Sequence, residues 1–264
     1  MAKRRAEQPL DLTGARILVT NDDGIHSPGL KVLVHIAKSL SKDVWVVAPE
    51  SEQSAVAHSL TLRRPVRLRS LGPRRFSLDG TPTDCVLVAA KKVLKDAPPD
   101  LVLSGVNDGG NLGEDVTYSG TVAAAMEATL LGFPSVALSQ MRRPDGAPRY
   151  AVAEHHGAEV LRRLLAIGWP KQVLLNINFP ACTPDEIAGV VACRQGAREF
   201  GSNVVEGRDP GGRPYIWVGN YVNDATKERG TDLAAVALNQ ISVTPLHLDL
   251  THRSSLKALR QALE

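Results

Sequence analysis

Two adjacent carboxylates, Asp22 and Asp23, follow an apolar run in the sequence Asn-Asp-Asp-Gly. Neighbouring carboxylates at the end of a strand repel one another unless a cation or strong hydrogen-bond donors lie between them. Their hard oxygen atoms suit Mg²⁺ or Mn²⁺, and Gly24 permits the turn that lets both side chains reach one ion. The pair is therefore a candidate metal site. The alternative is an ordinary turn with a helix cap, which favours the same residue types.

Two more loops carry oxygen atoms that would complete such a site. Ser54 lies in the polar segment 49–54, and Asn107 lies in the glycine-rich segment 105–113. The Ser54 hydroxyl and the Asn107 amide carbonyl are neutral oxygen ligands, and the glycines let the backbone approach a ligand closely. The alternative for the second loop is a flexible connector, although loops of this length commonly carry function.

Ser119, Gly120 and Thr121 stand immediately before an alanine-rich helical segment and form a candidate anion site. The free N–H groups and the dipole of a helix N-terminus attract phosphate, and the two hydroxyls would add donors. The alternative is an ordinary N-cap, because Ser and Thr are favoured there without any ligand. Neither the P-loop pattern nor the GxGxxG fingerprint occurs, so the sequence does not predict the usual binding loop for a nucleoside triphosphate or a dinucleotide.

The elements that must position these residues alternate between short β-branched strands and helical segments. This alternation predicts βαβ units, and hence an α/β fold with a doubly wound, mostly parallel, Rossmann-like sheet. The carboxyl ends of such strands meet at one edge, which would bring the loops together. The predicted strands are 15–20, 44–48, 101–104, 135–139 and 173–179, and the predicted helices are 28–40, 83–95, 121–131 and 151–167.

The last third of the chain has a different character. Segment 196–230 is rich in Gly, Asp, Asn and Arg and holds only short strand-like pieces such as 215–218. This composition predicts a projecting β-hairpin arm or long loops, and 256–263 predicts a terminal helix. The expected organisation is an N-terminal extension at 1–14, an α/β catalytic core at 15–195, and an oligomerisation arm with a helix at 196–264 within the same domain.

The composition of the chain limits which kinds of binding partner and which cellular compartment are expected. Of 264 residues, 31 are Lys or Arg and 28 are Asp or Glu, so a formal charge of +3 gives little reason to expect a nucleic acid polymer. The longest largely apolar stretch, 121–131, is too short to cross a bilayer, so no membrane partner is expected. Cys85, Cys182 and Cys193 form no CxxC motif and favour core thiols in a reducing compartment. With no secretory signal evident, a cytoplasmic protein is predicted.

Several long motifs in one order give a family resemblance. The chain is similar to the stationary-phase survival protein SurE family of metal-dependent 5′-nucleotidases. The similarity extends from Arg16 to about Thr251 and is densest up to Ser139. The motifs that carry it are TNDDGIHSPGL, APESEQSAVAHSLTL, GTPTDCV, SGVNDGGNLGEDVTYSGTVAAAMEA, GTDLAAV and SVTPLHLDLT.

The resemblance implies a role for each matching position. One divalent cation, Mg²⁺ or Mn²⁺, would be held by Asp22, Asp23, Ser54 and Asn107. Phosphate would be held by Asn111, Ser119, Gly120 and Thr121, and the catalytic set would be Asp22, Asp23 and Asn111. The implied substrates are nucleoside 5′-monophosphates, with 3′-monophosphates and polyphosphate as further candidates. The implied assembly is a homodimer or homotetramer formed through the C-terminal arm.

The expected reaction is hydrolysis of a phosphomonoester to a nucleoside and phosphate. The attacking water is activated by the metal or by a carboxylate such as Asp22, and an aspartyl-phosphate intermediate is a third alternative. A protein of another class, a metal-binding phospho-receiver or regulatory module without turnover, also carries a carboxylate pair after its first strand. Such a module is usually one small domain, whereas this chain has 264 residues and a candidate anion site for a diffusible substrate.

Overall fold

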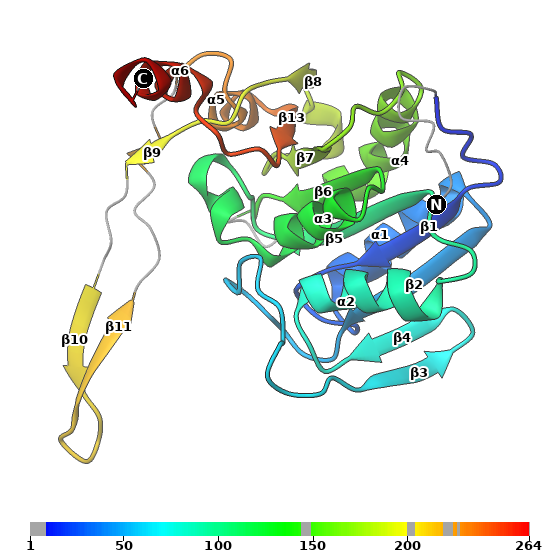
Figure 1. The fold of residues 1–264 in the computed structure, drawn as a ribbon, viewed down its shortest axis with the longest axis horizontal. Helices are drawn as coiled ribbons and strands as arrows, with labels where there is room; N and C mark the ends of the chain where they lie inside the picture. Colours follow the sequence, from blue (N-terminus) through cyan, green and yellow to red (C-terminus); the bar gives the residue numbers. More distant parts are fainter. Residues whose placement is uncertain (1–8, 144–148, 200–203, 219–223, 226–227, 264) are drawn as a thin grey trace.

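The fold is built on one nine-stranded sheet, seen in the computed structural model of the chain (Figure 1). The structure describes residues 9–143, 149–199, 204–218, 224–225 and 228–263. The strands of the sheet are β1 (Arg16–Thr20), β2 (Asp43–Pro49), β3 (Leu68–Gly72), β4 (Arg75–Leu78), β5 (Leu101–Asp108), β6 (Ser135–Gln140), β7 (Val173–Phe179), β8 (Gly189–Ala192) and β13 (Gln240–His247).

The sheet is mixed but mostly parallel. Its strand order is β3-β4-β2-β1-β5-β6-β7-β13-β8. The neighbours from β4 through to β7 pair in parallel, and β13 pairs in parallel with β8. Only β3–β4 and β7–β13 pair antiparallel within this sheet, as far as the structure describes it. The predicted doubly wound α/β class is therefore confirmed.

Helices cover both faces of the sheet. Helices α1 (Pro28–Leu40) and α4 (Ala151–Leu165) pack on one face, and α2 (Pro82–Val88) and α3 (Gly120–Leu130) pack on the other. Strand β1 shows the reason, because Ile17 and Val19 pack in the cluster that contains α1 and α4, whereas Leu18 packs in the cluster that contains α2 and α3. A strand buried on both faces reads as the continuous apolar run seen in the sequence.

Most predicted elements agree with the structure, and two differ in an informative way. The predicted bounds of helix 28–40 and strand 173–179 are confirmed, but the predicted helix 83–95 begins at Pro82 and ends at Val88, where a π-helical turn (η1, Ala89–Val93) follows. Its N-cap is Thr81, which forms a capping box with Asp84. Strand β5 continues to Asp108, four residues past the predicted end, so Asn107 lies on the strand and not in a loop.

The C-terminal third adds edge strands, small helices and a projecting arm. Figure 1 shows the hairpin of β10 (Val204–Arg208) and β11 (Pro214–Val218) standing away from the sheet, as the sequence predicts. At its base, β9 (Arg198–Glu199) pairs antiparallel with β12 (Asp224–Ala225). The remaining elements are the 3₁₀ turns η2 (Gly113–Thr117) and η3 (Pro184–Glu186), and the helices α5 (Asp232–Ala237) and α6 (Arg253–Leu263).

Cys85, Cys182 and Cys193 are buried free thiols, as predicted. Within the described ranges, no helix combines the length and the apolar character needed to span a membrane.

Candidate active site

Asp22 lies two residues after the end of β1 and is buried against the N-terminus of α3. Only 4% of the residue is exposed, and the hydroxyl of Thr121 donates a hydrogen bond to its Oδ1. A Cβ added at Gly120 would lie 2.8 Å from the Cβ of Asp22, so this approach requires glycine. The backbone N–H of Gln53 donates to the carbonyl of Asp22 over 2.8 Å. The loops after β1 and β2 and the start of α3 therefore meet at Asp22.

The two adjacent carboxylates are electrostatically unfavourable in the folded chain. Burial raises the pKa of Asp22 from 3.8 to about 7, and the charge of Asp23 adds to the rise, while hydrogen bonds from Thr121 oppose it. Burial also raises the pKa of Asp23, with further increases from the charges of Asp108 and Glu52. Arg142 opposes the rise at Asp23 only in part. A cation bound here would therefore stabilise the ionised form of both carboxylates.

Asn107 lies at the end of β5, next to Asp108, whose backbone bonds to Asp23. The backbone N–H of Asp108 donates to Asp23 Oδ2 over 3.4 Å, which joins the ends of β1 and β5. The Asn107 Nδ2 donates to the carbonyl of Gly109 over 2.9 Å. This bond orients the side-chain amide and leaves its Oδ1 as the atom suited to a cation.

Ser54 reaches the same edge through the loop after β2. Its neighbour Gln53 is bonded to Asp22, and a Cβ at Gly24 would lie 3.2 Å from the backbone of Ser51, so this loop packs on the turn that holds the carboxylates. The Ser54 side chain is exposed, and its hydroxyl donates to Glu52 Oε1 over 2.7 Å. The hydroxyl oxygen keeps its lone pairs for a ligand.

The N-terminus of α3 has the form of an anion site. Ser119 is the N-cap residue, and its Oγ accepts a hydrogen bond from the N–H of Val122 over 3.1 Å. The Ser119 hydroxyl proton and the N–H of Gly120 remain suited to a ligand, since N–H groups of the first helical turn have no partner within the helix. The hydroxyl of Thr121 is engaged by Asp22, so Thr121 connects the two halves of the site.

Asn111 is held rigidly at the edge of this region by a cluster of asparagines. Asn178 Oδ1 accepts from the Asn111 backbone N–H over 2.8 Å, and the side-chain amides of Asn176 and Asn178 donate to the Asn111 carbonyl over 2.8 and 3.1 Å. The Asn111 Nδ2 donates to Ser139 Oγ over 2.7 Å. The backbone path of the glycine-rich loop at residue 111 is therefore fixed from β7.

The residues present fit a divalent cation that is bound partly by neutral oxygens. Among the described residues, no three His, Cys, Asp or Glu side chains gather closely enough to hold a metal by themselves. Two carboxylates from Asp22 and Asp23 give the charge, so the coordination would depend on the hydroxyl of Ser54 and the amide of Asn107 for further ligands. An oxygen-only set of this kind suits Mg²⁺ or Mn²⁺ better than a softer metal.

Sequence reasoning missed three features of the site. Asn176 and Asn178 sit two positions apart in an apolar strand and so point to one face, and this spacing was the available signal. His58 Nε2 lies 3.1 Å from Glu127 Oε2 on α3, a partner that the sequence alone did not indicate. Asp108 forms ion pairs with two arginines that come from beyond β6, Arg142 (3.2 Å) and Arg149 (2.7 Å).

This arrangement defines a class of protein. It is an open α/β protein in which the carboxyl ends of neighbouring parallel strands carry paired carboxylates, neutral oxygen ligands and a helix N-terminus at one edge of the sheet. The chain belongs to the family described as Survival protein SurE, whose sequence model matches residues 17–202.

Named relatives extend the match over nearly the whole chain. A protein of Paramagnetospirillum magneticum named 5′-nucleotidase SurE is 54% identical over 252 residues, which cover 96% of this chain and 97% of the relative. Its namesake in Rhodopseudomonas palustris strain BisA53 is 55% identical over 94% of this chain and 99% of its own. The crystal structure of the SurE protein from Aquifex aeolicus superimposes with a TM-score of 0.81 at 40% identity, covering 94% of this chain and all of that one.

Proposed function

We propose that the chain is a divalent-metal-dependent 5′-nucleotidase that hydrolyses nucleoside 5′-monophosphates to a nucleoside and phosphate. The observation that carries the proposal is the contact of Asp22 with the first turn of α3, through the Thr121 hydroxyl and the bare face of Gly120. This contact supports a cation ligand and a phosphate site that share one wall, as hydrolysis of a phosphate ester requires. The names of the relatives support the substrate class.

Each group of residues has a separate task in this proposal. Asp22, Asp23, Ser54 and Asn107 would hold the cation, which when bound supplies positive charge for the phosphate oxygens and acidifies a water. Ser119 and the N–H of Gly120 would bind phosphate oxygens, with the dipole of α3 favouring the negative charge. Thr121, whose backbone and hydroxyl both bond to Asp22, would join the phosphate site to the cation ligand. Asn111, whose backbone is fixed by Asn176 and Asn178, would help to orient the phosphate.

The test is phosphate release from adenosine 5′-monophosphate by the metal-stripped protein with and without Mn²⁺ or Mg²⁺. We expect many turnovers per chain with metal, and a loss of about 100-fold or more in kcat for Asp22→Asn and Asn107→Ala. Asp96→Asn is the matched control, because Asp96 is exposed in a turn after η1, and it should retain full activity. Full activity of Asp22→Asn would refute the site assignment.

The same assay separates the enzyme from a phospho-receiver. A receiver would incorporate at most one phosphate per chain and would release none catalytically. Substrate panels that include nucleoside 3′-monophosphates and polyphosphate would define the wider range that we propose for the same site.

We also propose that residues 196–264 assemble the chain into a homodimer or homotetramer around the catalytic core at 15–195. Apolar side chains stand exposed on the projecting hairpin, with Val205 56%, Ile216 67% and Trp217 67% exposed. Apolar surface of this kind on a hairpin is typical of a protein interface. Light scattering after gel filtration should give a multiple of the 28.3 kDa chain mass, and Trp217→Lys should lower it. A monomeric wild-type chain would overturn this part of the proposal.

A further inference from the structure

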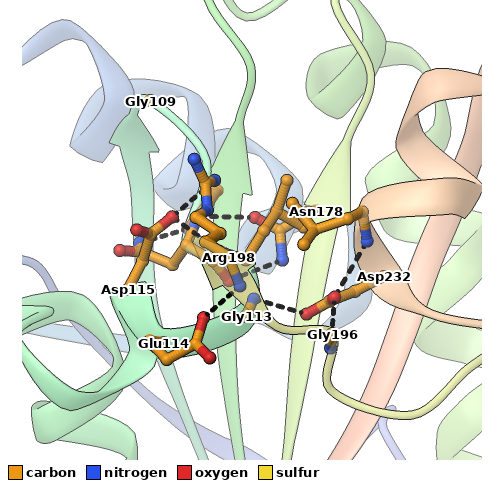
Figure 2. A network of polar contacts seen from close by, with 12 residues as sticks. Gly109, Gly113, Glu114, Asp115, Asn178, Gly196, Arg198 and Asp232 are labelled. Atoms are coloured by element: carbon orange, nitrogen blue, oxygen red, sulfur yellow. Dashed lines mark hydrogen bonds and ion pairs between the residues drawn. The ribbon is translucent and has the colours of Figure 1, made fainter. Parts of the chain in front are cut away.

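A buried carboxylate joins the base of the arm to the glycine-rich loop. Asp232, the first residue of α5, has no exposed surface. Its Oδ2 accepts from the backbone N–H of Gly113 over 2.9 Å, and its Oδ1 accepts from those of Gly196 and Leu233, each over 2.8 Å. Figure 2 shows Asp232 between Gly113 and Gly196. One side chain therefore fixes three backbone segments that are far apart in the sequence.

A buried ion pair reinforces this connection. Arg198 Nη2 lies 2.8 Å from Asp115 Oδ2, and the two side chains are only 10% and 17% exposed. The backbone N–H of Arg198 donates to Glu114 Oε2 over 2.7 Å, and Gln195 Nε2 donates to the carbonyl of Gly113 over 2.9 Å. The 194–198 segment thus contacts three successive residues of the loop, Gly113 to Asp115 (Figure 2).

Asp115 relays these contacts to both sides of the candidate phosphate site. Its Oδ2 accepts from the N–H of Leu112, the residue after Asn111, over 3.1 Å. Its carbonyl accepts from the N–H of Ser119, the N-cap of α3, over 3.0 Å. Asp115 is therefore bonded next to Asn111 on one side and at Ser119 on the other, within the single 3₁₀ turn η2.

These polar contacts fix the path of the loop backbone, and they are not needed merely to hold α5 against the loop. Leu112, Leu233 and Val236 form a buried apolar cluster that already holds α5 against the loop. The polar contacts are made mostly with backbone groups of the loop, and such directional bonds fix register where apolar packing does not. An ion pair as buried as Arg198–Asp115 also contributes little net stability over apolar residues of similar size.

We propose that Arg198 and Asp232 are positioning residues for phosphate binding, acting through Asp115 and Gly113 on the segment from Asn111 to Ser119. Arg198 is also the first residue of β9, which pairs with β12 at the base of the arm. The base of the arm therefore supports the catalytic site. A change in the conformation of the arm would be transmitted to the phosphate site through η2. The proposal rests on the function proposed above.

The first test compares Arg198→Gln with Arg213→Gln in the full-length chain. Arg213 lies in the same arm with its side chain 86% exposed, which makes it a matched control. With adenosine 5′-monophosphate and Mn²⁺, Arg198→Gln should raise both KM and the inhibition constant of inorganic phosphate by roughly 10- to 100-fold, with a smaller change in kcat. Arg198→Lys should restore part of the loss, and Arg213→Gln should leave all three constants unchanged.

A double variant asks whether Arg198 acts through the phosphate site. If it does, the effect of Arg198→Gln on the phosphate inhibition constant should be smaller in the Ser119→Ala background than in the wild type. Two independent effects that multiply would overturn the proposal, as would an Arg198→Gln enzyme whose KM and phosphate inhibition match the wild type.

Amide hydrogen exchange gives a readout that needs no activity. Exchange over residues 112–119 should be faster in Arg198→Gln than in the wild type, while the core strand β1 stays protected. A wild-type chain without phosphatase activity would refute the proposed function. The exchange result would still test whether Arg198 holds residues 112–119 in place. Unchanged exchange over 112–119 would refute the connection even in an active enzyme.

Discussion

Replacing Asp22 by Asn should stabilise the metal-free protein while it removes activity. The pKa of Asp22 is raised from 3.8 to about 7, mainly by burial, so at neutral pH and above the folded state carries a buried charge that the unfolded chain exposes to water. A rise of that size corresponds to a cost on the order of 4 kcal/mol once the group is fully ionised. Asparagine removes the charge and keeps an oxygen acceptor for the Thr121 hydroxyl.

The stability difference between Asp22→Asn and the wild type should depend on pH in a definite direction. Between pH 4 and pH 7 the folded state binds a proton at Asp22 that the unfolded state has lost, so wild-type stability falls as pH rises through this window and the penalty is complete above about 7. The stability gained by Asp22→Asn should therefore be small near pH 4 and largest at pH 8. The gain corresponds to roughly 5–15 °C in melting temperature at pH 8 for a chain of this size.

Thermal unfolding of metal-stripped protein across this pH range measures the effect. Mn²⁺ should raise the melting temperature of the wild type at pH 8, because it binds only the folded state, and should raise that of Asp22→Asn much less. The exposed Asp96→Asn variant should follow the wild-type curve. If the wild type and Asp22→Asn change in parallel from pH 4 to pH 8, the burial argument for Asp22 is refuted.

Three further substitutions probe the walls of the site. Gly120→Ala should lower stability by about 1–3 kcal/mol in denaturant titrations and reduce activity, because its Cβ would meet Asp22 at 2.8 Å. Thr121→Val should cost roughly 1–3 kcal/mol of stability in the same titrations, and it should move the loss of stability with rising pH to higher pH, because its hydroxyl helps to keep the pKa of Asp22 down. Asn178→Leu should reduce kcat/KM by about 10-fold or more in steady-state assays, because the backbone of Asn111 loses both bonds to Asn178 and keeps only the one from Asn176.

Matched controls test the first two of these results. Gly14→Ala introduces the same methyl group where nothing lies within 4 Å, so it should change neither stability nor activity. Thr121→Ser keeps the hydroxyl and should retain most of the wild-type behaviour. A Gly120→Ala variant with unchanged activity, or a Thr121→Val variant whose stability depends on pH as in the wild type, would show that the contact with Asp22 is not a functional one.

The parallel half of the fold was predictable because its signals are local. Strand 16–20 is a continuous apolar run, and Pro28–Leu40 combines a helical spacing of apolar residues with proline in its first turn. The antiparallel hairpin β3–β4 was missed, since only Leu78 of its residues is a fully buried large side chain and its outer strand is largely exposed. An exposed edge strand has little hydrophobic pattern to reveal it.

The residues of the candidate site were predictable for the same reason, but their supports were not. Short motifs place Asp22 after β1 and Ser119 before α3, and the structure brings these two segments together. The bond between Asp232 and Gly113 spans 119 residues, and the ion pair of Arg198 with Asp115 spans 83. Nothing in the local sequence of either partner specifies the other.

The sequence by itself determined the alternating strands and helices of the parallel half and the polar residues that follow its strands, because each depends on local propensity, periodicity and capping. Only the tertiary structure decided how deeply Asp22 is buried, which hydroxyl reaches it, and how the base of the arm supports the loop before α3. Burial and long-range hydrogen bonds depend on where distant segments meet in space, and that meeting is a property of the packed fold and not of any single segment.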